Sequence, residues 1–167
     1  MENKKILVVD DEKDSATALR LFIEKIGKYE IRVETIGSQA FAAAKQFKPD
    51  LMLLDIMMPD VDGGEVANQM KADDETSDIP IVFVSGAITK EEAREQGSIQ
   101  GGYPIIAKPV LMNEIAEVIG KYIPEKARPS EEYAAPSLNT EQNILSAERR
   151  NHTRIQTGGR LSYTCID

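Results

Sequence analysis

The chain has 167 residues, 41% of them hydrophobic, which suffices for one domain with a real core and an appendage. The net charge of -8 lies in residues 1–124, where 22 acidic residues stand against 14 basic ones, so nonspecific binding to nucleic acid is not expected. A single cysteine, Cys165, excludes an intramolecular disulfide, and the lack of a signal peptide or an apolar stretch of membrane-spanning length predicts a cytoplasmic protein without membrane contact.

Five short apolar runs alternate with helix-like segments over residues 1–124. Strands are predicted at 4–9, 30–35, 50–55, 80–85 and 103–107. This alternation is typical of an α/β protein in which helices cover both faces of a five-stranded parallel sheet. Because the runs are apolar throughout, the strands are predicted to be buried on both faces.

The predicted helices differ in how well they can pack on the sheet. Clear apolar stripes are formed by Leu19, Phe22, Ile23 and Ile26 in the first helix and by Leu111, Ile115, Val118, Ile119 and Tyr122 in the last. The fourth helix, in TKEEAREQG, has a capping box of Thr89 and Glu92 but only Ala93 as an interior apolar anchor. This helix is therefore predicted to be held weakly and to be able to move.

The composition changes after Ile123. Residues 125–147 are predicted to be a linker, rich in Pro, Ser, Ala and Glu, that leads into a short helix, TEQNILSAERR, capped by Thr140. Residues 148–167 then show strand-like alternation at Leu161, Tyr163 and Cys165. The chain thus stops inside a predicted strand.

Five polar residues directly close or follow four of the apolar runs. They are Asp10 and Asp11, Asp55, Ser85 and Lys108. Because functional groups collect beyond the carboxyl ends of parallel strands, these side chains are predicted to converge. Carboxylates that lie close together repel one another and need a hard cation between them, which predicts a Mg²⁺ site.

These residue types suit phosphoryl transfer. Asp55 is the predicted nucleophile, since a carboxylate can attack phosphorus and hold the group as an acyl phosphate. Asp10 and Asp11 would seat the metal. Lys108 would supply a second cation, and the Ser85 hydroxyl would donate a hydrogen bond to an oxygen of the transferred group.

Four strings of residues 1–124 resemble the receiver domain of the response regulators of bacterial two-component signalling. They are VVDDE at 8–12, LLDIMMPDVDGGEV at 53–66, VFVSG at 82–86 and IIAKP at 105–109. The resemblance implies a flavodoxin-like (βα)5 fold with strand order 2-1-3-4-5 and a cis bond before Pro109. It implies a phosphoacceptor at Asp55, metal ligands at Asp10, Asp11, Asp55 and the Met57 carbonyl, a switch hydroxyl at Ser85 and a phosphate contact at Lys108.

The resemblance also implies what the domain does. A histidine kinase or phosphotransfer protein would donate the phosphoryl group from a phosphohistidine, with Mg²⁺ as cofactor. The receiver would catalyse its own phosphorylation and dephosphorylation without being an ordinary turnover enzyme. Phosphorylation would shift the fourth helix and fifth strand, which together with the last helix form the surface for an output segment or a homodimer. No DNA-binding domain is seen.

One position departs from the family pattern. Where receivers often carry Tyr or Phe, three residues before Lys108, this chain has Ile105. Tyr103 lies two residues earlier and is predicted to share the same face of the strand. It is open whether Tyr103 replaces the usual aromatic residue in switching or has a packing role.

The segment ERRNHTRI at 148–155 resembles the opening of a PilZ domain, whose RxxxR motif is matched by Arg150 and Arg154 with Arg149 beside them. In that family the arginines bind cyclic di-GMP, a use that suits guanidinium groups. The alternative is a solvated basic stretch. Because the rest of a PilZ barrel is missing, residues 148–167 are predicted to be its truncated start or a disordered tail, and cyclic di-GMP is expected only if a complete domain follows.

Two alternatives come from other functional classes. A Mg²⁺-dependent phosphohydrolase with an aspartyl-phosphate intermediate would also use an Asp nucleophile and metal carboxylates. Such enzymes usually carry an acid two residues after the nucleophile, where this chain has Met57. A phosphorylation-independent interaction module is disfavoured, because every active-site residue that the resemblance implies is present.

Overall fold

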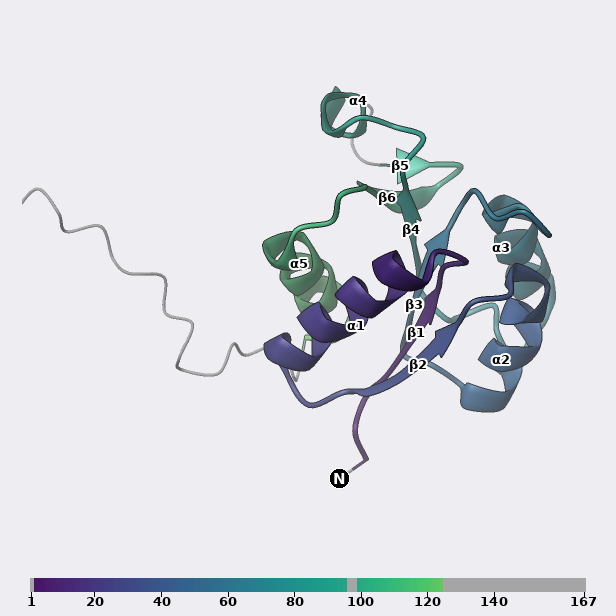
Figure 1. Ribbon diagram of the computed structural model, residues 1–167. Coiled ribbons are helices and arrows are strands. Elements are labelled where there is room, and N and C mark those ends of the chain that lie inside the picture. Colours follow the sequence, from purple (N-terminus) through teal and green to yellow (C-terminus); the bar gives the residue numbers. More distant parts are fainter. Residues whose placement is uncertain (1, 96–98, 125–167) are drawn as a thin grey trace, which may run out of the picture. The chain divides into compact units, whose positions relative to one another are not determined.

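The computed structural model describes residues 2–95 and 99–124 (Figure 1). The strands are β1 Lys5–Val9, β2 Glu30–Glu34, β3 Leu51–Asp55, β4 Ile81–Ser85, β5 Ile99–Gln100 and β6 Tyr103–Ala107. The helices are α1 Lys13–Ile26, α2 Ala40–Phe47, α3 Gly63–Ala72, α4 Lys90–Glu95 and α5 Met112–Tyr122, with a 3-10 turn, η1, at Gly37–Gln39. All described residues belong to one compact unit.

The sheet has the strand order β2-β1-β3-β4-β6-β5. All pairs from β2 to β6 in this order are parallel, so the predicted five-stranded parallel sheet is confirmed, as is the order implied by the family resemblance. Each of these strands begins and ends within one residue of its predicted bounds. The order reverses direction between β1 and β3, which makes the carboxyl ends of these two strands the place where a site is expected.

A short sixth strand was not predicted. β5 pairs antiparallel with β6, and Gln100 lies opposite Tyr103, so Gly101 and Gly102 form a two-residue turn. Both glycines have positive φ, 58° and 88°, which is the backbone of a tight hairpin turn and is accessible to glycine without strain. A two-residue strand is too short to show a pattern in the sequence.

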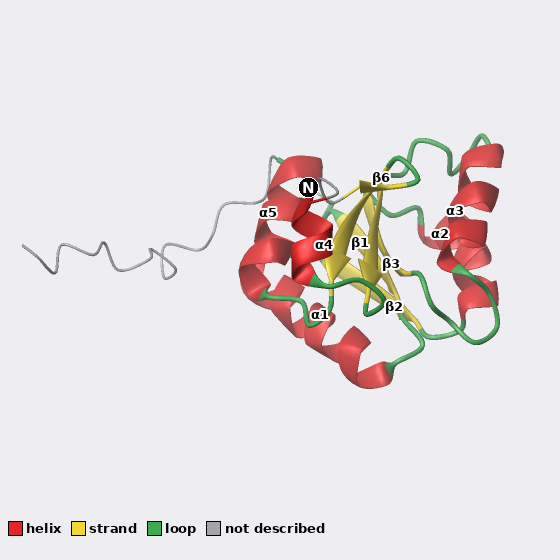
Figure 2. Cartoon of the chain, turned by 90° about the horizontal axis from the view of Figure 1, so that it is seen from above, coloured by secondary structure: helices red, strands yellow, loops and turns green. Residues whose placement is uncertain are grey.

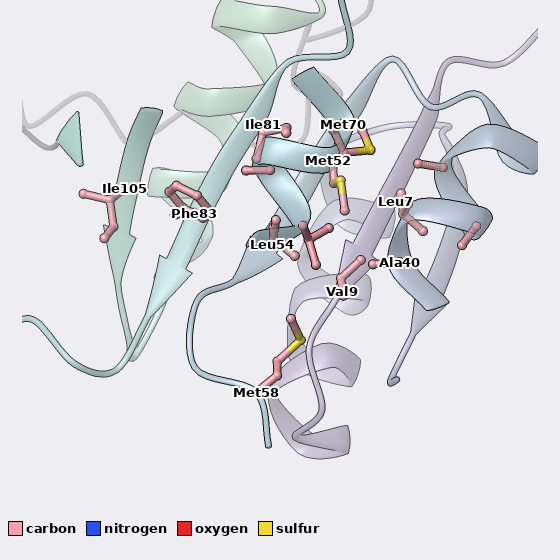
Figure 3. Close-up of a cluster of buried hydrophobic side chains, with 14 residues drawn as sticks. Leu7, Val9, Ala40, Met52, Leu54, Met58, Met70, Ile81, Phe83 and Ile105 are labelled. Carbon is pink, nitrogen blue, oxygen red and sulfur yellow. The ribbon is translucent and has the colours of Figure 1, made fainter. Parts of the chain in front are cut away.

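Each face of the sheet is covered by a pair of helices (Figure 2). Along β1, Ile6 and Val8 point into the layer with α1 and α5, whereas Leu7 and Val9 point into the layer with α2 and α3. Figure 3 shows the second layer, which includes Met52, Leu54, Met70, Ile81, Phe83 and Ile105. The central strands are buried on both faces, as the continuous apolar runs predicted.

The helix predictions are confirmed with two corrections. Leu19 and Ile23 of α1 and Ile115 and Ile119 of α5 are buried in one layer. Leu111 does not belong to the α5 stripe, because it precedes the helix and is 49% exposed. Phe22 is only partly buried and lines a groove beside the β6–α5 loop rather than the core.

The structure of α4 agrees with the expected weak anchoring. The Thr89–Glu92 capping box is present: the Glu92 carboxylate accepts from the Thr89 backbone N–H at 2.8 Å, and Thr89 Oγ1 accepts from the Glu92 N–H at 3.2 Å. Ala93 is the one buried residue in this six-residue helix. Within the described residues, no helix is long and apolar enough to span a membrane.

Candidate functional site

Three carboxylates meet at the carboxyl edge of the sheet. Asp10 follows β1 and Asp55 ends the neighbouring β3, because Val9 and Leu54 are paired across these strands. One oxygen from each of Asp10, Asp11 and Asp55 lies within 4.8 Å of the others. Asp10 is 1% and Asp55 4% exposed, so burial keeps two of the three charges from being solvated. The predicted convergence of these residues is confirmed.

Lys108 connects the carboxylates. It follows β6, and its Nζ lies 2.8 Å from Asp10 Oδ2 and 3.3 Å from Asp55 Oδ2. Glu12 Oε2 lies further away, at 3.8 Å, and its side chain is 65% exposed. One ammonium therefore balances part of the negative charge of the buried pair, and the remaining charge favours a cation.

The pKa values reflect this arrangement. Burial raises the pKa of Asp55 above its ordinary value, and the neighbouring charge of Asp10 adds to the rise, although Lys108 opposes it. Burial by itself lowers the pKa of Lys108, but the hydrogen bonds and charges of Asp10 and Asp55 outweigh burial and raise it. Lys108 is thus held as a cation between two carboxylates.

Asp10 is held by several donors. Its Oδ1 accepts from the Glu12 backbone N–H at 2.9 Å, and its Oδ2 accepts from Ser15 Oγ at 2.7 Å as well as from Lys108. Ser15 was missed by the sequence analysis, since a serine in the first turns of a helix is common and carries no signal by itself.

Ser85 ends β4 at the same edge of the sheet and is fully buried. Its neighbour Val84 is paired with Asp55 across the β3–β4 ladder. The Ser85 Oγ accepts a hydrogen bond from the Ala87 backbone N–H at 3.0 Å. The hydroxyl proton is therefore available for another acceptor.

The loop after β3 is packed tightly against Asp55. The Met57 backbone N–H donates to Asp55 Oδ1 at 3.2 Å, and the Gly63 N–H donates to the Ile56 carbonyl at 2.7 Å. A Cβ on Gly63 would overlap the backbone carbonyl oxygen of Asp55. The glycine is thus required for the close approach of α3 to the loop. The Met57 side chain is 66% exposed.

Ile105 and Tyr103 lie on the same face of β6, as predicted, because both pack in the layer with α2 and α3. Ile105 is 5% exposed. The Tyr103 ring contacts the Phe83 ring edge to face, with centroids 5.3 Å apart. Both side chains therefore have a packing role in this structure.

Two further predictions from the sequence concern the bond before Pro109 and the arginines near the end of the chain. The Lys108–Pro109 bond is cis, in agreement with the family resemblance. Arg149, Arg150 and Arg154 lie outside the residues that the structure describes.

The residues present fit a bound Mg²⁺. The carboxylates of Asp10, Asp11 and Asp55 supply hard oxygen ligands, which are the ligands that this ion prefers. Asp11 is the most exposed of the three, so the cluster is open to solvent on one side. Mg²⁺ usually keeps several waters, which suits such a half-open site.

A doubly wound α/β domain with an acidic cluster and a lysine at its topological switch point is the class of protein defined by this fold and site. The family model described as "Response regulator receiver domain" matches residues 6–120, and the chain belongs to this family.

Individual relatives agree with this assignment. The chain is 34% identical over 122 residues to the polar-differentiation response regulator DivK of Brucella anthropi, covering 72% of this chain and 96% of DivK. It is 36% identical over 108 residues to protein PilH of Pseudomonas aeruginosa, and the match covers 64% of this chain and 86% of PilH. The receiver domain of a Pseudomonas aeruginosa sensor histidine kinase, solved with a magnesium ion in its active-site cleft, superposes with a TM-score of 0.62 at 22% identity, covering 74% of this chain and 99% of that domain. This last likeness shows the fold.

Proposed function

We propose that this receiver is a phosphorylation-dependent signalling switch whose phosphoacceptor is Asp55. The observation that carries the proposal is the buried carboxylate of Asp55 facing the Lys108 ammonium beside two further carboxylates. The donor would be a phosphohistidine on a histidine kinase or phosphotransfer protein, as membership of the family suggests. This function would be carried out in the phosphorelay of a two-component system.

The transfer can be written as one displacement. An Asp55 carboxylate oxygen attacks the phosphorus, the bond from phosphorus to the donor nitrogen breaks, and the nitrogen keeps the electron pair. Lys108 and the Ser85 hydroxyl stabilise the negative charge on the phosphoryl oxygens. Asp10, Asp11, Asp55 and the Met57 carbonyl would hold Mg²⁺, which would offset charge on the phosphoryl oxygens when bound.

A change at this site would be passed to the surface through Ser85. Ser85 would move toward the phosphorylated Asp55, and the segment between Ser85 and α4 would follow. The α4–β6–α5 face contains a groove of about 270 Å³, whose lining includes Lys90, Ala93, Ile105 and Val118. Because α4 has a single buried residue, a small free-energy change can alter this face for an output partner or a second copy.

A separate prediction concerns residues 148–167. The resemblance of residues 148–167 to the start of a PilZ domain rests on the sequence, and the match to the receiver family ends at residue 120. Cyclic di-GMP is therefore proposed as a ligand only for a chain in which a complete PilZ domain follows.

The proposal is tested by incubating the protein with Mg²⁺ and acetyl phosphate and measuring the intact mass. Wild type is expected to gain one acid-labile phosphoryl group, and Asp55→Asn to gain none. Asp60→Asn is the matched control, because Asp60 lies in the same loop and accepts a backbone hydrogen bond from Ser38 that asparagine can also accept. Equal labelling of wild type and Asp55→Asn would show that Asp55 is not the acceptor.

A further inference from the structure

Ser15 is the residue near the site whose contacts are not explained by the family motifs. Its Oγ donates to Asp10 Oδ2 at 2.7 Å, and the same oxygen accepts from Lys108 at 2.8 Å. Because Asp10 is 1% exposed, its carboxylate has little water to replace a lost donor. Ser15 therefore makes one of the few hydrogen bonds that hold this buried charge.

The use of the Ser15 hydroxyl is unusual for a helix. Thr17, two residues later in α1, donates its hydroxyl to the Lys13 carbonyl one turn back, which is the common local bond of such residues in helices. Ser15 instead donates to a side chain outside the helix. The helix itself is anchored by Leu19 and Ile23, which are buried, so the hydroxyl is presented from a fixed position.

We propose that Ser15 is a positioning residue that orients the Asp10 carboxylate for Mg²⁺. This inference rests on the proposed function of the site. Besides Lys108, Ser15 is the side-chain donor to Asp10 Oδ2 among the described residues. Outer donors of this kind commonly contribute tenfold or more to metal affinity.

The experiment measures the dissociation constant of Mg²⁺ by following backbone amide NMR shifts during titration of the full chain. Ser15→Ala is expected to raise this constant roughly tenfold. Ser15→Thr retains the hydroxyl and is expected to stay within about twofold of wild type. Thr17→Ala removes a hydroxyl from the same helix that does not contact Asp10, and it is the matched control.

A second measurement separates positioning from a general defect. The rate of labelling by acetyl phosphate is measured over a range of Mg²⁺ concentrations. For Ser15→Ala, more Mg²⁺ should be needed for half-maximal rate, whereas the rate at saturating Mg²⁺ should approach that of wild type. The melting temperature in EDTA shows whether each variant is folded.

Three results would overturn the inference. They are a Mg²⁺ affinity of folded Ser15→Ala equal to that of wild type, an equal loss in Thr17→Ala, and a loss in Ser15→Thr as large as in Ser15→Ala. Labelling of wild type at Asp55 together with any of these results would leave the proposed function intact. If wild type neither binds Mg²⁺ nor takes the label, the proposed function fails and the inference fails with it.

Discussion

At the scale of single residues, the site places ionised groups where water is scarce. Asp10 and Asp55 are buried side by side, and Lys108 lies between them. Burial and the charge of Asp10 both raise the pKa of Asp55, so the ionised carboxylate is less stable in the folded protein than in the unfolded chain. The ionised Asp55 carboxylate is therefore maintained at some cost to the stability of the fold.

We therefore expect Asp55→Asn to stabilise the metal-free protein at pH 7, because the variant removes a buried charge. The gain should be roughly 1 kcal/mol, since solvent screening limits it. The pKa of Asp55 is raised on folding, so the full penalty is present when the pH is above the folded value. The advantage of Asp55→Asn should shrink as the pH falls through that raised pKa and vanish below the ordinary value of 3.8.

Urea unfolding of both proteins in EDTA across this pH range measures the difference. Asp74→Asn, at an exposed position, is the control and should differ little from wild type. A less stable Asp55→Asn at pH 7, or a difference that does not change with pH, would contradict the interpretation of the site.

Gly63 supports the site through its lack of a side chain. A Cβ at this position would overlap backbone atoms of Asp55 and Ile56, which cannot move independently of the sheet. Gly63→Ala is therefore expected to destabilise the protein by about 2 kcal/mol and to slow labelling of Asp55. Gly64→Ala is the matched control, since its Cβ would meet only the flexible side chain of Asp62. Equal stabilities of the two variants would show that the loop has room to adjust.

At the scale of elements, α4 is attached differently from the other helices. It contributes one buried side chain, Ala93, and an ion pair between Lys90 and Glu114 with N–O distances of 3.0 and 3.1 Å. Glu114 also accepts from the Leu111 backbone N–H at 2.8 Å, just before α5. One carboxylate thus connects α4 to the loop that follows Lys108.

Glu114→Gln should loosen α4 without unfolding the domain, because glutamine retains an acceptor for the Leu111 N–H but loses the charge that attracts Lys90. Hydrogen exchange of the α4 amides is expected to become severalfold faster, whereas the global stability should fall by less than about 1 kcal/mol, as for other partly exposed ion pairs. Glu65→Gln, at an exposed position of α3, is the control. Unchanged exchange in α4 would mean that this ion pair does not hold the helix.

At the scale of the whole molecule, the acidic cluster brings distant parts of the chain together. Asp10 and Asp11 follow β1, Asp55 ends β3, and Lys108 follows β6, so an ion bound among the carboxylates would bridge segments that separate on unfolding. A ligand that binds only the folded state stabilises it by mass action.

Mg²⁺ at ten times its dissociation constant should therefore stabilise the protein by about 1.4 kcal/mol and raise the melting temperature by several degrees. Asp11→Ala should remove most of this shift, because it deletes one of the three carboxylates. Asp14→Ala is the control, since Asp14 is an exposed acid in the first turn of α1. A shift of equal size in wild type and Asp11→Ala would argue against the predicted metal site.

Much of this protein is determined by local sequence. The parallel strands follow from continuous apolar runs, and α1 and α5 follow from apolar residues at helical spacing. The convergence of Asp10, Asp55 and Lys108 could also be predicted, because the carboxyl ends of parallel strands share one edge of the sheet. Periodicity and strand ends are properties of short segments, so they can be read before the chain is folded.

Other features were decided only by the tertiary structure. Three contacts depend on how closely separate parts of the chain approach one another. They are the hydrogen bond from Ser15 to Asp10, the ion pair between Lys90 and Glu114, and the tight contact of Gly63 with Asp55. The β5–β6 hairpin likewise depends on pairing with an edge strand that already exists. A sequence pattern indicates which face of an element a residue occupies. The contacts between side chains depend on the packing angle and register of whole elements, and these are determined only when the elements pack together in the core.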